Sequence, residues 1–358
     1  MKRESNKSRN TTHELLVTRF RNISVIGDGA MATVMAILLC EKDISVRMWG
    51  YDREQLEQIE LAGENIKFLT GYRLPKNLVF EPDDDRIMAD ADLIVSAVPC
   101  QFVRQVFERL KAYVPEGVPI VSTAKGIEND TLLRPTQILT TVLWGNQATV
   151  DEQRAMRFAV LSGPTIADEL ARKLPATACA AAADEQLAKD VQSTFNCSWL
   201  RVYTNTDVVG VELAAACKNI IAIAAGIIDG IGAGDNAKAA LLCRGLAEIT
   251  RLGIACGARP QTFAGLTGLG DLVTTCISPK GRNRSFGERI GKGQNVEAAQ
   301  RATESVIEGF ATCKSVITLA EKYCVEMPIT QAVYEVLFED KPVQTAITDL
   351  MKRRLKAE

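Results

Sequence analysis

The sequence is almost without histidine. Its 358 residues contain one, His13, in a polar N-terminal stretch. This scarcity argues against three kinds of site that depend on imidazole: a multi-histidine metal site, a Ser-His-Asp triad and a histidine general acid. We therefore predict no resident metal, and we expect any acid–base chemistry to come from lysine, aspartate, glutamate, tyrosine or cysteine side chains.

The sequence also lacks an excess of charge of either sign. Lysine and arginine number 42 and aspartate and glutamate number 44, so the formal net charge is −2. A surface that binds nucleic acid is usually basic. We therefore expect no nucleic-acid partner.

Two signals of export and of cysteine chemistry are missing as well. None of the ten cysteines is spaced as C-x-x-C, which argues against a zinc ribbon or a redox motif. Residues 1–21 are polar and basic and hold no apolar segment of the kind found in secretory signals. We expect a cytoplasmic protein with reduced thiols.

Short β-branched runs alternate with helical segments in the first half of the chain. The expected strands are 23–26, 45–49, 93–98, 119–124 and 158–161, and the expected helices are 30–40, 54–60 and 102–113. Strands that alternate with helices predict a parallel sheet covered on both faces. The first half is therefore predicted to be an α/β domain.

The pattern changes after about residue 203. Segment 208–231 is apolar almost all round, but Glu212, Lys218, Asn219 and Asp229 interrupt it. We interpret it as the central buried helix of a helical domain and expect no stable membrane insertion. The predicted organisation is a flexible extension over 1–20, an α/β domain over 21–203 and an all-α domain over 204–358, with further helices at 237–252, 312–322 and 331–338.

The first strand leads directly into a glycine-rich turn. Residues 27–32 read Gly-Asp-Gly-Ala-Met-Ala, which is G-x-G-x-x-A at the start of an apolar helix. Gly27 permits a tight turn, Gly29 lets a pyrophosphate approach the backbone, and Ala32 lets the helix pack close to the strand. The helix N-terminus then offers free N–H groups to phosphates. The turn predicts a dinucleotide site, against the alternative of a glycine turn that binds nothing.

The choice between NAD and NADP stays open at this point. An acidic residue at the end of the second strand would hydrogen-bond the ribose hydroxyls of NAD. Asp52 lies a little late for that role, and Arg53 could pair with a 2′-phosphate instead. Both are also plausible loop charges.

Two lysines occupy unusual positions. Lys218 lies midway through the most apolar helix, where it either reaches the surface along its apolar stem or serves chemistry. Burial would lower its pKa and let it exchange a proton with a substrate oxygen. Asn219 could bond substrate or make a polar contact inside the domain. Lys125 follows the fourth strand, at the sheet edge where ligands bind, although an ordinary loop lysine is the alternative.

The helical half carries a candidate anion grip. Residues 265–272 form an apolar turn, expected to be flexible, with the single carboxylate Asp271. Residues 281–284 then read Gly-Arg-Asn-Arg. A guanidinium matches the geometry of a phosphate, so Arg282 and Asn283 beside a glycine suit an anion. Surface arginine pairs are common, so this segment alone is weak evidence.

Together these segments closely resemble the NAD(P)-dependent glycerol-3-phosphate dehydrogenases of the bacterial biosynthetic type. The resemblance runs from about residue 22 to the C-terminus and rests on matches at 27–33, 124–128, 161–169, 216–223, 268–272, 282–284 and 307–309. It implies a Rossmann-type NAD(P)-binding domain followed by an all-α domain. It also implies reversible reduction of dihydroxyacetone phosphate to sn-glycerol 3-phosphate, which feeds phospholipid synthesis. Many members are dimers, so a homodimer is expected.

The resemblance also assigns roles residue by residue. Lys218 matches the proton donor and acceptor, Asp271 would orient it, Lys125 would lie near cofactor and substrate, and Thr275 and Asn219 are further catalytic-site positions. The implied substrate contacts are Lys125, Gly163, Thr165, Lys218, Asp271, Gly281, Arg282 and Asn283. The implied contacts with NAD or NADP are Gly27, Gly29, Ala30, Met31, Tyr51, Phe68, Lys125, Ala167, Arg282, Val306 and Glu308.

Three departures and two rival interpretations accompany this resemblance. Ala32 replaces the third fingerprint glycine, Gly281 stands where many members have serine, and residues 1–20 have no counterpart. One rival is a β-hydroxyacid type of dehydrogenase, which also uses a lysine on a helix but would not be expected to carry the Arg-Asn-Arg segment. The other is a dinucleotide sensor without turnover, against which the joint presence of Lys125, Lys218 and Asp271 argues.

Overall fold

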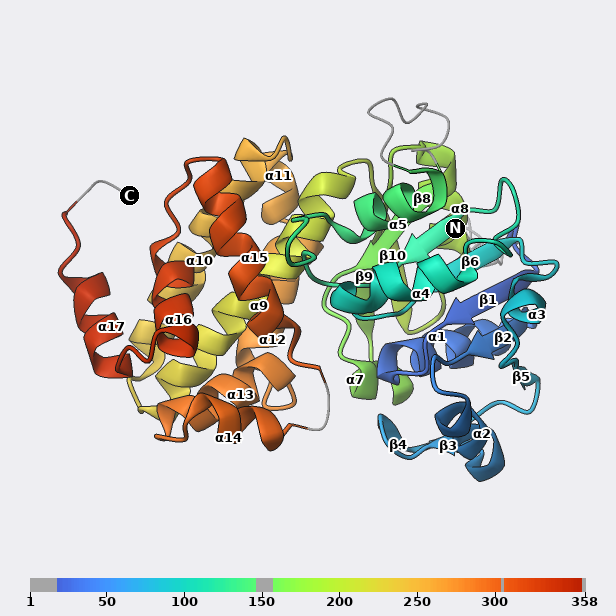
Figure 1. Ribbon diagram of the computed structural model, residues 1–358, viewed down its shortest axis with the longest axis horizontal. Coiled ribbons are helices and arrows are strands. Elements are labelled where there is room, and N and C mark those ends of the chain that lie inside the picture. The colour runs from blue at the N-terminus through green and yellow to red at the C-terminus, as the bar shows by residue number, and fades with distance from the viewer. Residues whose placement is uncertain (1–17, 146–156, 304–305, 356–358) are drawn as a thin grey trace, which may run out of the picture.

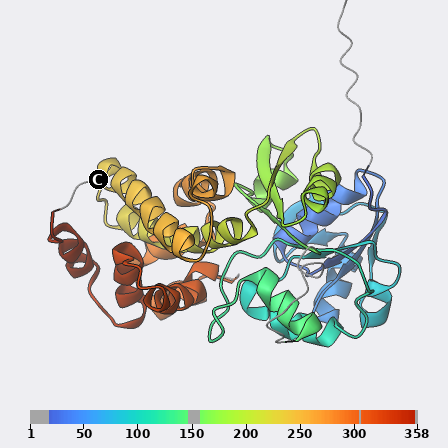
Figure 2. The same cartoon turned by 90° about the horizontal axis from the view of Figure 1, so that it is seen from above.

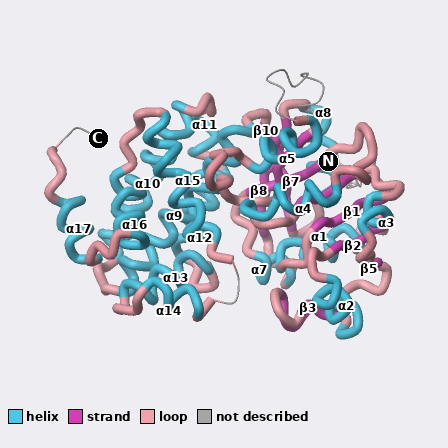
Figure 3. The backbone as a smooth tube through the Cα atoms, viewed as in Figure 1, coloured by secondary structure: helices cyan, strands magenta, loops and turns pink. Residues whose placement is uncertain are grey.

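The computed structural model describes residues 18–145, 157–303 and 306–355. A sheet domain and a helical domain lie side by side, with the blue-to-green half of the chain forming the first and the yellow-to-red half the second (Figure 1). All the strands belong to the first domain (Figure 3). The predicted fold class, an α/β domain followed by an all-α domain, is confirmed.

The sheet has eight strands in the order β10-β9-β8-β7-β6-β1-β2-β5. Every pairing is parallel except β8 with β9. This order, which reverses direction around β1, is of the Rossmann type. The strands are β1 Asn22–Ile26, β2 Ser45–Trp49, β5 Leu78–Phe80, β6 Leu93–Ser96, β7 Ile120–Ser122, β8 Phe158–Ser162, β9 Ala176–Ala182 and β10 Leu200–Asn205, beside a separate hairpin of β3 Glu64–Asn65 and β4 Leu69–Arg73.

Helices cover both faces of the sheet because alternate strand residues point to opposite sides. Val25 and Val95 belong to one apolar cluster, whereas Ile26 and Ile94 belong to another. The helices and turns of this domain are α1 Ala30–Cys40, α2 Arg53–Ala62, α3 Asp84–Met88, η1 Cys100–Phe102, α4 Val103–Leu110, α5 Pro135–Trp144, α7 Ala167–Ala171 and α8 Glu185–Phe195. Figure 2 shows the domain from above.

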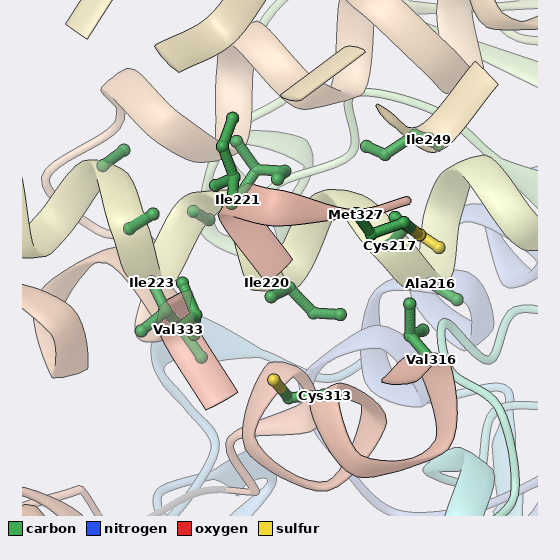
Figure 4. Packing of buried hydrophobic residues seen from close by; sticks show 14 of the residues in the cluster. Ala216, Cys217, Ile220, Ile221, Ile223, Ile249, Cys313, Val316, Met327 and Val333 are labelled. Atoms are coloured by element: carbon green, nitrogen blue, oxygen red, sulfur yellow. The ribbon is translucent and has the colours of Figure 1, made fainter. Parts of the chain in front are cut away.

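The helical domain is built around α9, Val208–Gly230. Its apolar side chains form the centre of the largest core, where Ile220, Ile221 and Ile223 pack among residues of the surrounding helices (Figure 4). The other elements are α10 Asp235–Ala255, α11 Pro260–Phe263, η2 Leu266–Gly270, α12 Asp271–Ile277, α13 Arg282–Gly291, α14 Val296–Arg301, α15 Glu308–Lys322, α16 Pro328–Phe338 and α17 Val343–Met351.

Helix α9 is long and apolar enough to cross a membrane by length and composition alone. However, 94% of its most apolar window is buried inside the protein. It is therefore a core helix, as the sequence indicates.

Glycines bring α9 and α13 unusually close together. A Cβ atom added to Gly226 of α9 would lie 1.9 Å from the carbonyl oxygen of Arg284, and one added to Gly287 of α13 would lie 2.0 Å from that of Ile223. Only glycine fits at either position. The crossing therefore fixes where the N-terminus of α13, with Arg282, lies relative to α9.

A buried ion pair joins α9 to the sheet domain. The Glu212 carboxylate is fully buried and pairs with the Arg134 guanidinium, just before α5. It also accepts hydrogen bonds of 2.8 Å from the backbone N–H and from the hydroxyl of Thr136. The first turns of α9 are thereby held against the sheet domain.

The edges of the predicted regions differ in detail from the observed elements. Strand β10 runs to Asn205 and α9 begins at Val208, so the boundary predicted after residue 203 falls inside β10. Most of the predicted extension lies outside the described residues. Its last part packs against the sheet domain, because the Thr18 hydroxyl is 2.7 Å from that of Thr194 and Phe20 is buried in the core.

Candidate active site

The turn between β1 and α1 has the geometry that a pyrophosphate requires. Gly27 has φ +123°, and a Cβ atom there would lie 2.8 Å from the carbonyl oxygen of Ala97. Gly29 is different, because a Cβ atom on it would meet nothing within 4 Å, so the space over the helix N-terminus is open. No side chain caps α1. Its first N–H groups, at Ala30 and Met31, therefore remain available to an anion, and the residues fit a dinucleotide.

Three charged side chains meet between the two domains. The Nζ atom of Lys218 lies 2.8 Å from Oδ1 of Asp271, and Nζ of Lys125 lies 2.8 Å from Oδ2 of the same carboxylate. Lys218 also donates to the Thr275 hydroxyl, which in turn donates to Asp271 at 3.2 Å. We call these four residues the lysine cluster. They come from the end of β7, from α9 and from α12.

Burial makes the Lys218 ammonium easy to deprotonate. Its side chain is only 5% exposed, and the loss of water around the charge lowers its pKa from 10.5 to about 8. The nearby ammonium of Lys125 also lowers this pKa, while the Asp271 carboxylate opposes both effects. A group with a pKa near neutrality can both give and take a proton.

The predicted substrate positions in the sheet domain lie beside this cluster. The Lys125 ammonium donates to the carbonyl oxygen of Gly163 at 3.0 Å, and the Thr165 hydroxyl donates to the same oxygen at 3.1 Å. A small pocket is lined by Lys125, Thr165 and Met31 among others. It brings the start of α1 and the lysine cluster to one place.

The predicted positions in the helical domain surround the cluster from the other side. Burial raises the pKa of Glu308, at the start of α15, while the charges of Arg282, Lys125 and Lys218 lower it. Asn283 accepts a 2.9 Å hydrogen bond from the backbone N–H of Gly309, next to Glu308. The Asn219 amide approaches the Lys125 carbonyl oxygen at 3.5 Å.

The neighbouring Arg284 is not part of an anion grip. Its guanidinium lies 2.6 Å from Asp229 at the end of α9 and 3.1 Å from Glu288 in α13. Of the Arg-Asn-Arg segment, Arg284 is thus engaged by carboxylates of its own domain, and the predicted grip concerns Arg282 and Asn283. Arg282 itself is exposed at the first position of α13, directly after Gly281, and faces the charge of Glu308.

The turn over 265–272, which we expected to be flexible, is folded into helical structure. Residues Leu266–Gly270 form one wide helical turn, in which the N–H of Gly270 donates to the carbonyl oxygen of Gly265, and α12 begins at Asp271. The Asp271 carboxylate is thereby fixed at a helix start. Its two ammonium partners complete the anchoring.

The remaining predicted cofactor positions lie on four other segments. Tyr51 is 51% exposed just beyond β2, and its hydroxyl accepts from Gln105 at 2.8 Å. Phe68 lies in the turn between β3 and β4, where its N–H donates to Asn65 at 3.2 Å. Ala167 is the first residue of α7, and Val306 is 39% exposed two residues before α15.

A contact that the sequence did not indicate joins α7, strand β4 and the segment just before α13. The Asp168 carboxylate in α7 pairs with Lys280, which precedes Gly281, and with Arg172 at 3.2 Å. It also accepts from the Tyr72 hydroxyl of β4 at 2.8 Å. These hydrogen bonds hold the pKa of Asp168 below its usual range. Asp168 lies inside one of the matched motifs, but no sequence pattern indicated its partners.

Among the described residues, no group of three or more histidine, cysteine, aspartate or glutamate side chains could hold a metal ion. All ten cysteines are free thiols, and burial raises the pKa of several of them, Cys179 to about 11. The charged side chains that meet between the two domains are two lysines and a carboxylate.

Comparison with known proteins agrees with this geometry. Residues 22–188 match the model of the NAD-dependent glycerol-3-phosphate dehydrogenase N-terminus and residues 207–348 that of its C-terminus. A glycerol-3-phosphate dehydrogenase [NAD(P)+] of Chlorobium phaeobacteroides (strain BS1) is 45% identical over 94% of this chain and 98% of its own length.

Solved structures give the same result. The glycerol-3-phosphate dehydrogenase of Coxiella burnetii is 35% identical, with a TM-score of 0.87 over 93% of this chain and 99% of that one. A 2-dehydropantoate 2-reductase from Geobacter metallireducens GS-15, at 15% identity and a TM-score of 0.57 over 89% of this chain and all of that one, shares the fold alone. The chain belongs to the NAD(P)-dependent glycerol-3-phosphate dehydrogenase family.

Proposed function

We propose that this chain interconverts dihydroxyacetone phosphate and sn-glycerol 3-phosphate, with Lys218 as the group that gives and takes the proton. The observation that carries this proposal is the Lys218–Asp271–Lys125 arrangement, in which Lys125 lines one pocket together with Met31 at the start of α1. When bound, the nicotinamide of NAD(P)H supplies a hydride to the ketone carbon.

The residues of the chain divide the remaining work among them. Arg282, exposed at the N-terminus of α13, binds the phosphate group, because a guanidinium and a helix N-terminus both favour an anion. The ammonium of Lys218 donates a proton to the oxygen of the former carbonyl as negative charge develops there, and the neutral amine takes it back in the reverse direction.

Lys125 and Asp271 prepare this step. The second ammonium adds positive charge beside the developing alkoxide, which stabilises it in a site largely shielded from water. Asp271 holds both ammonium groups at 2.8 Å and so fixes their separation. Thr275, between Lys218 and Asp271, keeps the Lys218 side chain from rotating away.

A substrate screen and a variant test the proposal together. Oxidation of NADH and of NADPH is followed with dihydroxyacetone phosphate and, separately, with β-keto acids. We expect activity with the phosphorylated ketone, and activity only with the keto acids would contradict the assignment. Lys218→Ala should lower turnover by about 10²- to 10⁴-fold while dinucleotide binding survives. Near-normal turnover of this variant would show that another group supplies the proton.

Wider roles follow from the same family membership. We propose that the product feeds glycerophospholipid synthesis, that the enzyme works in the cytoplasm and that it forms a homodimer. Light scattering of the purified protein measures the last point directly, and a mass of one chain would contradict it.

A further inference from the structure

The end of strand β2 lacks the acidic residue that usually recognises NAD. The last residue of β2 is Trp49, followed by Gly50 and Tyr51. The backbone N–H of Gly27 donates to the Trp49 carbonyl oxygen at 2.8 Å, so the phosphate turn and the end of β2 are in contact. In folds of this type the adenosine ribose lies at this place.

The nearest acidic residue along the chain is already engaged. Asp52 precedes α2, and its Oδ1 atom accepts hydrogen bonds from the N–H groups of Glu54 at 3.0 Å and Gln55 at 3.4 Å. Asp52 is therefore the N-cap of α2. This bonding gives it a structural role.

A different carboxylate, that of Asp28, lies at the end of β2. Asp28 is the residue between the two glycines of the phosphate turn, and a Cβ atom added to Gly50 would lie 3.1 Å from its Oδ2 atom. The Asp28 side chain thus lies against Gly50, in space that the side chain of a larger residue at position 50 would occupy.

The Asp28 backbone is held in this place. The fully buried Asn65 donates from Nδ2 to the carbonyl oxygen of Asp28 and to the Thr33 hydroxyl, each at 2.8 Å. A carboxylate on a turn held in this way is suited to discriminate between two ligands that differ by one phosphate group.

Two arginines that could attract a phosphate here are paired with other groups. The Arg53 guanidinium lies 3.1 Å from Asp83. Arg109 donates to both oxygens of Asp84, at 2.6 and 2.8 Å, and lies over the Tyr51 ring at 5.5 Å. If either arginine bound a phosphate, its guanidinium would have to divide its hydrogen bonds between that phosphate and its present carboxylate partner.

We infer that Asp28 is the residue that makes this enzyme prefer NAD(H) to NADP(H). Its carboxylate accepts hydrogen bonds from the ribose hydroxyls of NAD(H) and repels the 2′-phosphate of NADP(H). The inference rests on the dinucleotide use in the proposed function. It narrows that use to one of the two cofactors.

The test measures binding without turnover. NADH and NADPH are titrated against the purified full-length protein, without substrate, and the dissociation constants are read from nicotinamide fluorescence. We expect NADPH to bind at least about tenfold more weakly, because a hydrogen bond to a charged group contributes roughly that factor or more. Asp28→Asn, which keeps the size and removes the charge, should reduce the preference about tenfold. Asp28→Ala should do the same.

A control addresses the one nearby cation whose charge acts on Asp28. The Lys67 ammonium lies 5.0 Å from the Phe68 ring. If Lys67 bound a 2′-phosphate, Lys67→Met would weaken NADPH binding selectively. We expect it to leave the order of the two cofactors unchanged.

The outcomes separate this inference from the proposed function. Wild-type protein that binds both cofactors equally, or NADPH more tightly, overturns the inference, and so does an unchanged ratio in folded Asp28→Asn. Wild-type protein that prefers NADH but does not reduce dihydroxyacetone phosphate contradicts the proposed function and leaves the role of Asp28 standing.

Discussion

Replacing Asp271 with asparagine tests how the lysine cluster sets the acidity of Lys218. The substitution keeps the size of the side chain and removes the negative charge that lies 2.8 Å from both ammonium groups. That charge raises the pKa of Lys218, in opposition to burial and to Lys125, which lower it. In Asp271→Asn the pKa of Lys218 must therefore fall below the wild-type value of about 8.

The size of the effect follows from the distance. An opposite charge within hydrogen-bonding reach shifts a pKa by about 1 to 3 units. A fall of one to two units would leave about 9% to 1% of Lys218 protonated at pH 8, compared with about half in the wild type. The loss of acid form alone then lowers the rate of ketone reduction at pH 8 by about 5- to 50-fold.

The assay is the pH dependence of kcat/KM for reduction of dihydroxyacetone phosphate. In the wild type we expect this rate to fall as pH rises through about 8, and the rate of glycerol 3-phosphate oxidation to rise there. In Asp271→Asn both changes should move to lower pH, so that part of the reduction activity returns below pH 7. Thr275→Val, which removes a hydrogen bond but no charge, should move them much less.

Thermal melts accompany the profiles. The folded pKa of Lys218 lies below its unfolded value of 10.5, so the fold prefers the neutral amine and gains stability from this group as pH rises from about 8 to above 10.5. In Asp271→Asn that window should begin at lower pH. A reduction profile that stays in place in a folded variant would refute the electrostatic role of Asp271.

Two further predictions concern the helical domain. Gly226→Ala would place a Cβ atom 1.9 Å from the Arg284 carbonyl oxygen. It should lower the free energy of unfolding in urea by about 3 kcal/mol or more. Gly245→Ala, whose Cβ atom would meet only the Ile221 side chain at 2.8 Å, should lower it less. Equal losses would contradict the close helix crossing. Arg282→Ala should raise the KM for dihydroxyacetone phosphate by about 10- to 100-fold with little change in melting temperature, and Arg301→Ala, an exposed arginine of α14, serves as its control.

Much of the fold was predictable because it rests on local pattern. The apolar run of α9 and the strand–glycine–helix order around Gly27 mark their elements within a few residues. Strand β9 was not predicted, since its sequence ATACAAA contains no β-branched residue other than threonine and no alternation. Its backbone packs closely on the neighbouring strand, because a Cβ atom on Gly163 would lie 3.2 Å from the Cα of Ala178.

The site was predictable in its residue types and less so in its contacts. A lysine in an apolar helix stands out in any sequence, so Lys218 could be found. That Asp271 bonds two ammonium groups could not, because Lys125 lies 146 positions earlier and only the packed domains bring them together. Arg284 illustrates the same limit, since its partner Asp229 lies at the far end of another helix.

The division of the lysine cluster between distant parts of the chain has a consequence for biosynthesis. A ribosome completes the Rossmann-type sheet with Lys125, and then α9 with Lys218, before it adds Asp271. Until then the two ammonium groups have no shared counter-ion, and Lys218 enters the growing core most easily as a neutral amine. A nascent or truncated chain that ends before α12 therefore has both lysines but lacks the carboxylate that lies between them in the complete fold.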